Sequence, residues 1–148
     1  MIITDNIRSQ AIQVKSIIVF YTILLVINTF AHEKIDVLYS MIPYIWLFIF
    51  ICLAPIIVAF FLLTQFARHA SVALLGILSA ILIYNIITRF SASPILFSQN
   101  SSFFWKVIYE GSFGLMLVSE VIAIWLTFKL LREIHKQIDS PSGNIPKS

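Results

Sequence analysis

Long apolar runs, separated by short clusters of charged residues, dominate the pattern of this sequence. The longest run covers residues 37–67, which are 31 consecutive residues without a charge. A helix on the surface of a soluble protein carries a polar face, with polar residues every third or fourth position. The centre of this run, residues 44–63, has no charged or amide side chain. It has the length of roughly 20 apolar residues that a bilayer crossing requires, so it predicts a membrane span.

Three further apolar runs extend this prediction along the chain. Together they place spans at about residues 14–31, 42–64, 70–88 and 111–131. We therefore expect an all-α polytopic membrane protein, in which residues 1–148 form a single membrane domain with four transmembrane helices in one bundle. Residues 90–110 are expected to form the outer loop, and residues 132–148 an amphipathic extension and a cytoplasmic tail.

The first run also allows a second interpretation, as a cleaved signal peptide. Thr29-Phe30-Ala31 has the small-x-small pattern of a cleavage site. The region before the run is long, however, and the chain that follows is itself strongly apolar. These two features favour a span.

Composition and charge agree with a membrane protein. Hydrophobic residues make up 59% of the chain and charged residues only 11%, against about 25% charged residues in soluble domains. If both ends lie in the cytoplasm, seven of the ten Lys and Arg residues lie on the inner side and three, Lys34, Arg89 and Lys106, on the outer side. This bias favours an N-in, C-in topology by the positive-inside rule. We interpret the net charge of +3 as topological information and expect no nucleic-acid partner.

Glu120 is the acidic residue in the middle of a predicted span, and two hypotheses compete for it. Because a charge there costs several kcal/mol, an acid within the membrane indicates a functional site by default. In the functional hypothesis, Glu120 binds a cation or a proton on a transport path. In the structural hypothesis, it is protonated and hydrogen-bonds a neighbouring helix. Matching depths in an antiparallel bundle predicts partners at Thr22, Cys52, Ser79 and the Ile51 carbonyl that Pro55 leaves free.

Other polar and small residues are candidates for helix packing. Asn28 and Asn85 lie in the outer thirds of their spans, where they either bond to each other across the first and third helices or find separate partners. Gly76 and Ala80 form a small-xxx-small pair, which is typical of close helix approach.

The outer loop carries a cluster of aromatic residues around a lysine, typical of a short helix in the headgroup layer. This candidate interface for lipid or a partner consists of Phe103, Phe104, Trp105, Lys106 and Tyr109.

The sequence contains no pattern that indicates catalysis. It lacks H-E-x-x-H, C-x-x-C, G-x-S-x-G and a glycine-rich phosphate loop. His32, His69 and His135 fall on an outer loop, an inner loop and the tail, so we expect no shared metal site. Cys52 is the single cysteine, and we expect it to be a packing residue. The prediction is a protein without enzymatic activity, cofactor or metal. Its expected partners are the lipid bilayer and a membrane protein, or a second copy of the chain.

In size, hydrophobicity, basic balance and richness in isoleucine (27 residues against 9 valines), the chain resembles the inner-membrane entry-exclusion protein of F-type conjugative plasmids. That resemblance implies a multi-pass protein of the bacterial inner (cytoplasmic) membrane. Its implied role is to stop a cell that already carries the plasmid from receiving it again, by acting on the incoming mating apparatus.

Three alternatives remain open. Bacteriocin immunity proteins also act by contact within the membrane. Four-helix multidrug exporters resemble this chain in helix count, but their glutamate lies in the first span, whereas Glu120 lies in the last. The third alternative is an assembly subunit of a larger membrane complex.

The charge bias generates a topological prediction. Reporter domains fused after Ser148 and within residues 91–102 should report opposite sides of the membrane, because an odd number of predicted spans separates the two sites. Reporters such as alkaline phosphatase and a cytoplasmic fluorescent protein distinguish the two sides. The same answer from both positions would contradict the topology.

Overall fold

The computed structural model describes residues 4–34, 41–91 and 102–139, and leaves aside the side chains of residues 33, 41–49 and 88–91. Within these residues the chain forms four α-helices and one 3-10 turn. Their bounds are α1 (Asp5–Lys34), α2 (Met41–Phe60), η1 (Phe61–Leu63), α3 (Ala67–Ser91) and α4 (Phe103–Asp139). The central part of the expected outer loop, residues 92–101, and the end of the tail, residues 140–148, lie outside the description.

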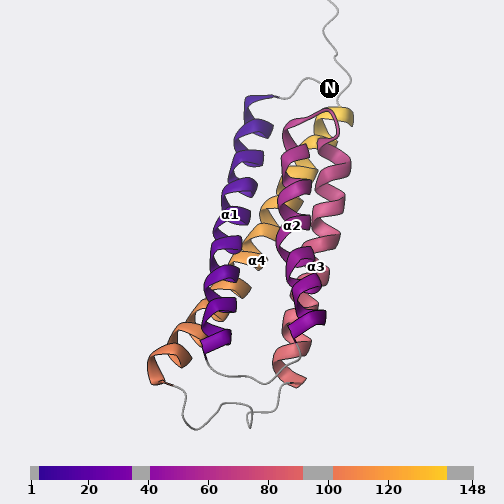
Figure 1. Ribbon diagram of the computed structural model, residues 1–148. Helices are drawn as coiled ribbons and strands as arrows, with labels where there is room; N and C mark the ends of the chain where they lie inside the picture. The colour runs from indigo at the N-terminus through magenta and orange to yellow at the C-terminus, as the bar shows by residue number, and fades with distance from the viewer. Residues whose placement is uncertain (1–3, 35–40, 92–101, 140–148) are drawn as a thin grey trace, which may run out of the picture.

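Successive helices run in opposite directions, so the bundle has an up-and-down arrangement (Figure 1). The first turn of α1 and the last turn of α4 lie at one end of the bundle, which we call the terminal end. The end of α1 and the start of α4 lie at the other end, which we call the loop end. Helix α4 packs against α1 along much of its length and also against α3, while α2 packs against α1 and α3.

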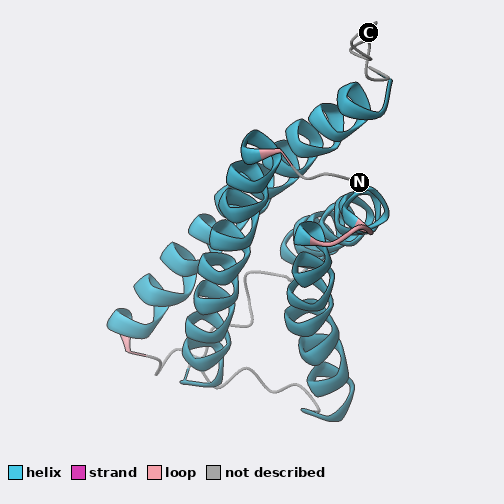
Figure 2. Ribbon diagram, turned by 90° about the horizontal axis from the view of Figure 1, so that it is seen from above, coloured by secondary structure: helices cyan, strands magenta, loops and turns pink. Residues whose placement is uncertain are grey.

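Three helices are long and apolar enough to cross a membrane: α1 over Asp5–His32, α3 over Ala67–Ile87, and α4. The expectation of an all-helical membrane protein is confirmed at this level, and the described residues contain no strand (Figure 2). In α2, the part with described side chains gives a shorter apolar helix, Phe50–Leu63. Whether all four helices cross the membrane belongs to the proposal below.

The helices extend further than the predicted spans. Helix α1 begins at Asp5, where the Arg8 amide donates to the Thr4 carbonyl at 3.0 Å, and an acid in the first turn favours a helix start. Helix α4 begins at Phe103, where the Trp105 amide donates to the Ser102 carbonyl at 3.1 Å. Residues 103–110, which we expected to form a separate short helix in the outer loop, are therefore the first turns of α4. Its last turns run through the amphipathic extension to Asp139.

The buried side chains of the three longest helices follow a heptad pattern, with alternating spacings of four and three residues. Such a stripe faces a neighbouring helix in left-handed packing. Along α1 the stripe consists of Ile7, Ala11, Val14, Ile18, Tyr21 and Leu25; along α3 of Ala67, Ser71, Leu74, Leu78, Ile81 and Asn85; along α4 of Met116, Glu120, Ala123, Thr127, Leu130 and Ile134.

Large apolar side chains cover the outer faces of the same helices. Val19 and Ile23 on α1, Ile83 on α3 and Val118 on α4 are each more than half exposed. A soluble protein rarely presents so large a continuous apolar surface. Lipid tails are a suitable solvent for it, in agreement with the three membrane-length helices.

The close packing at the interface between α1 and α4 generates a prediction. Ala123 is 1% exposed, so Ala123→Leu adds volume where none is free and should destabilise the protein by about 1–3 kcal/mol. Val121 on the same helix is 54% exposed, and Val121→Leu should change stability very little. Thermal unfolding of the purified protein in detergent measures both. Equal unfolding midpoints for the two variants would contradict this packing.

Candidate functional site

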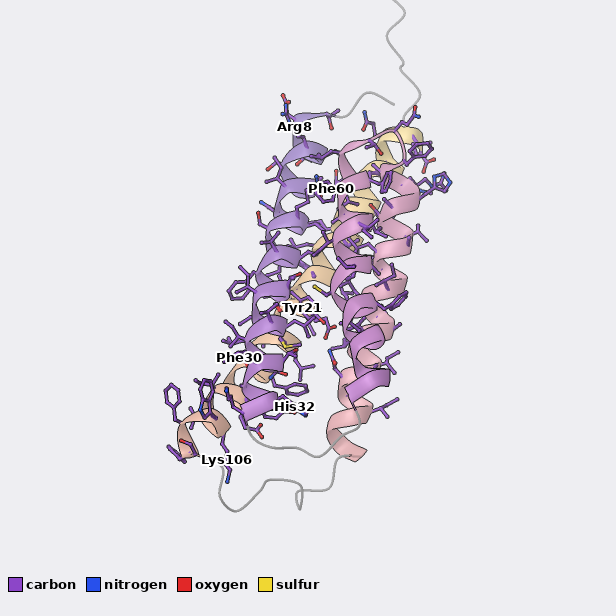
Figure 3. The ribbon with its side chains drawn as sticks, viewed as in Figure 1. Arg8, Tyr21, Phe30, His32, Phe60 and Lys106 are labelled. Atoms are coloured by element: carbon purple, nitrogen blue, oxygen red, sulfur yellow. The ribbon has the colours of Figure 1, made fainter. Side chains whose placement is uncertain are left out.

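Each helix contributes one polar side chain to a common level inside the bundle. We call this set the central polar layer; it consists of Tyr21 from α1, Cys52 from α2, Asn85 from α3 and Glu120 from α4. Tyr21 and Cys52 belong to one apolar cluster with Ile51, Ile81 and Met116, and Glu120, Asn85 and Cys52 all lie within electrostatic reach of the Tyr21 hydroxyl. Tyr21 points into the bundle from α1 (Figure 3).

The strongest link in this layer joins α3 to α4. The Asn85 side-chain amide donates to both oxygens of Glu120, with Nδ2–Oε1 and Nδ2–Oε2 distances of 3.4 and 3.2 Å. Glu120 is 0% exposed and Asn85 is 9% exposed. A hydrogen bond to a carboxyl group in such surroundings is favourable because neither partner can bond water instead.

The Tyr21 hydroxyl completes the layer from the side of α1. Tyr21 is 1% exposed, and its hydroxyl lies close to both Glu120 and Asn85. No hydrogen bond of normal geometry joins this oxygen to either residue in the present side-chain positions. The hydroxyl therefore has free hydrogen-bonding capacity directed at the carboxyl group.

The partner of Glu120 differs from those the depth argument predicted. Thr22 donates instead to the Ile18 carbonyl of its own helix, at 2.9 Å. Ser79 is half-buried and lies six residues before Asn85, about 9 Å along α3. The predicted partners assumed that each span ends at its flanking charged residues. The helices continue past those residues, so different side chains lie at the level of Glu120. On α2, Ile51 and Cys52 belong to the same apolar cluster as Tyr21.

The predicted bond between Asn28 and Asn85 is wrong, and the alternative of separate partners holds. The Asn28 amide donates to the Tyr109 carbonyl at 3.0 Å and to the Ser112 hydroxyl at 2.9 Å. Ser112 in turn donates to the Tyr109 carbonyl at 3.1 Å. Asn28 thus links α1 to the first part of α4, while Asn85 serves the central polar layer.

Gly76 does not mark a close helix contact inside this chain. It lies on the exposed side of α3 together with Ala80, and a Cβ atom added at Gly76 would have no heavy atom within 4 Å. The buried stripe of α3 runs along the other side, through Leu74 and Leu78.

The predicted aromatic cluster gathers at the loop end of the bundle. Phe103 and Phe104 are 81% and 62% exposed, and the Trp105 ring lies edge-on to Phe104 and Phe30, with centroid distances of 5.3 and 6.1 Å. Phe30 on α1 also lies under the Lys34 ammonium, 5.6 Å from its ring centroid. Figure 3 shows Phe30, His32 and Lys106 at this same end.

One side of this cluster packs against α1, and its other side is exposed. The Tyr109 ring packs against the His32 ring, with a centroid distance of 5.7 Å. The Phe103 and Phe104 side chains are mostly exposed. We call Phe30, Phe103, Phe104, Trp105 and Lys106 the loop-end aromatic surface.

Reasoning from the sequence missed Tyr21 and Ser112 as site residues. The signal was present as spacing: Tyr21 and Asn28 are one heptad apart on α1, as are Ser112 and Ser119 on α4. Among the side chains that the structure describes, no group of three or more His, Cys, Asp or Glu residues could hold a metal ion. Comparisons with protein-family models, curated proteins and solved structures found no match to this chain.

The link between Asn85 and Glu120 generates a prediction about stability. Glu120→Gln keeps the shape and an acceptor for Asn85, so membrane abundance should stay near that of the unchanged protein. Glu120→Leu leaves the Asn85 amide without its buried acceptor and should cost about 1–3 kcal/mol. Glu120→Lys adds a buried charge beside Asn85 and should sharply lower the amount of folded protein.

A double variant provides the control for this experiment. Asn85→Leu with Glu120→Leu removes both polar partners, so its loss of stability should be smaller than the sum of the two single losses. Abundance in membranes and unfolding midpoints in detergent give the four values of the cycle. Strict additivity would contradict a direct link between the two side chains.

Proposed function

We propose that this chain is a non-enzymatic, multi-pass protein of a bacterial inner membrane that acts by direct contact with another membrane protein. In this proposal all four helices cross the membrane, with both chain ends in the cytoplasm. The contact is made by the loop end of the bundle. Entry exclusion during conjugation, which blocks redundant plasmid transfer, is the function we assign to it.

The distribution of charge over the two ends supports the orientation. At the terminal end, Arg8, Arg68 and Arg132 lie on α1, α3 and α4, and Lys129 and Lys136 add to them. At the loop end, the described cationic side chains are Lys34 and Lys106. A cytoplasmic terminal end agrees with the enrichment of Lys and Arg on that side of membrane proteins.

The loop-end aromatic surface is the observation that carries the proposal. Its Phe103 and Phe104 rings stand on the first turn of α4 and are mostly exposed. Exposed aromatic side chains next to a cation are typical of protein interfaces, where they supply large contact areas at low entropic cost. In this proposal a partner on the outer side of the membrane binds to this surface.

A mating assay tests the assignment to conjugation. Recipient cells that produce the chain should receive an F-type conjugative plasmid at a lower frequency than cells with an empty vector, with equal growth. Transfer of a conjugative plasmid of an unrelated type into the same recipients provides the specificity control. Equal transfer of the F-type plasmid into both recipients would contradict the assignment.

Two pairs of substitutions test the role of the surface itself. Phe103→Ala with Phe104→Ala should weaken exclusion while membrane abundance stays unchanged, because both rings are exposed and contribute little to folding. Val118→Ala with Val121→Ala alters equally exposed positions in the middle of α4 and should leave exclusion intact. Loss of exclusion in the second pair alone would move the contact to the helix faces.

The buried carboxyl group favours a second candidate function, a small transporter that uses Glu120. A transporter that cycles protons needs an ionisable group, so Glu120→Gln should abolish its activity at normal protein abundance. An exclusion protein should tolerate the same change. Export of cationic dyes by cells with each variant, measured beside plasmid transfer, separates the two functions.

A further inference from the structure

We infer that Glu120 is a proton-binding site in which the bound proton joins the Glu120 carboxyl to the Tyr21 hydroxyl and holds α1 and α4 together. Asn85 orients the carboxyl group from α3. The inference concerns the central polar layer alone and does not depend on the function proposed above.

The charge environment of Glu120 supports a neutral carboxylic acid. Its recorded neighbours are Asn85 from α3 and Tyr21 from α1, with Cys52 from α2 beside Tyr21, and none of them is cationic. Among the described side chains, Lys15 lies 5.2 Å from the Phe60 ring centroid and Lys129 lies 5.7 Å from that of Trp125. An ionised carboxylate without a cation in an apolar medium costs several kcal/mol.

Hydrogen-bond capacity leads to the same conclusion. Asn85 offers its Nδ2 donor to both oxygens of Glu120. A protonated carboxyl group has one further donor and requires an acceptor for it. The Tyr21 hydroxyl oxygen is buried, close to Glu120 and without a hydrogen bond of normal geometry. We assign it as the acceptor for the proton on Glu120.

The position of the site gives the proton a structural role. Helices α1 and α3 stand on opposite sides of the bundle and have no backbone contact in the described residues, and the side chains of Tyr21, Asn85 and Glu120 lie together between them. If the Glu120 carboxyl group released its proton to water, it would become a carboxylate and could no longer donate a hydrogen bond to the Tyr21 hydroxyl. Because Glu120 is 0% exposed, water can reach it only when the helices separate at this level. Proton binding and closure of the bundle are therefore coupled.

Infrared spectroscopy tests the proton directly. The purified protein in lipid should show the C=O stretching band of a protonated carboxylic acid at neutral pH. Glu120→Gln should remove this band, and Glu110→Gln, an exposed acid on the same helix, should leave it. Absence of the band in the folded protein from mildly acidic to neutral pH would overturn the inference.

Tyr21→Phe tests the partner and does not require the loss of the carboxyl group. Removal of the hydroxyl acceptor should shift the carboxylic band to higher frequency, as expected for a carboxyl group that loses a hydrogen bond. Tyr84→Phe, at the residue directly before Asn85 on α3, provides a matched control and should leave the band frequency unchanged. A band that keeps its position in Tyr21→Phe would remove Tyr21 from the site.

A sodium titration separates a proton site from a site for monovalent metal ions. The carboxylic band should keep its intensity when sodium replaces choline in the buffer at constant pH. If sodium converts the band to that of a carboxylate, the site binds a metal cation in exchange for the proton and the inference is wrong. A rise in pH should weaken the band and lower the unfolding midpoint together, and Glu120→Gln should lose this dependence of the midpoint on pH.

Discussion

The hydrogen bond between Asn85 and Glu120 is the interaction that determines how these helices align. Apolar residues alone cannot do so, because lipid tails are as apolar as leucine and give little driving force for one alignment over another. A heptad pattern of apolar residues also leaves the helix register ambiguous, because a shift of one helix by seven residues again places apolar residues in the helix–helix interface. Such a slide of α4 would move Glu120 about 10 Å from Asn85 and leave two buried polar groups without partners. The 3.2 Å contact thereby selects one register from several.

A second polar contact fixes the other side of α4. Asn28 donates to Ser112 and to the Tyr109 carbonyl, one heptad along α1 from Tyr21. Helix α4 is therefore joined to α3 at one level and to α1 at another, which defines its register against both helices. The remaining buried hydroxyls in the seam satisfy themselves locally; Thr127 donates to the Ala123 carbonyl at 2.7 Å.

Much of the fold follows from the sequence, because a run of 18 or more apolar residues leaves few alternatives to a membrane-length helix. The helix limits do not follow as well. The predicted spans stopped at charged residues such as Arg89 and Arg132, yet helices tolerate charges at their ends as readily as apolar residues. The orientation of each helix also escaped prediction, since a helix that is apolar on all sides shows no hydrophobic periodicity. The polar residues at heptad spacing, Tyr21 with Asn28 and Glu120 with Thr127, carried that information.

Helix length explains how the two ends of the molecule can act as defined surfaces. Helices α1 and α4, with 30 and 37 residues, are about 45 and 55 Å long, whereas the hydrocarbon core is about 30 Å thick. Both helices must therefore tilt or extend beyond it, and residues that a topology diagram assigns to loops lie on helical turns. Phe103 and Phe104 stand on such a turn, where Phe104 packs against Trp105 and Trp105 packs against Phe30. A partner that binds them does not have to order a loop first, and preorganisation of this kind favours binding because little conformational entropy is lost.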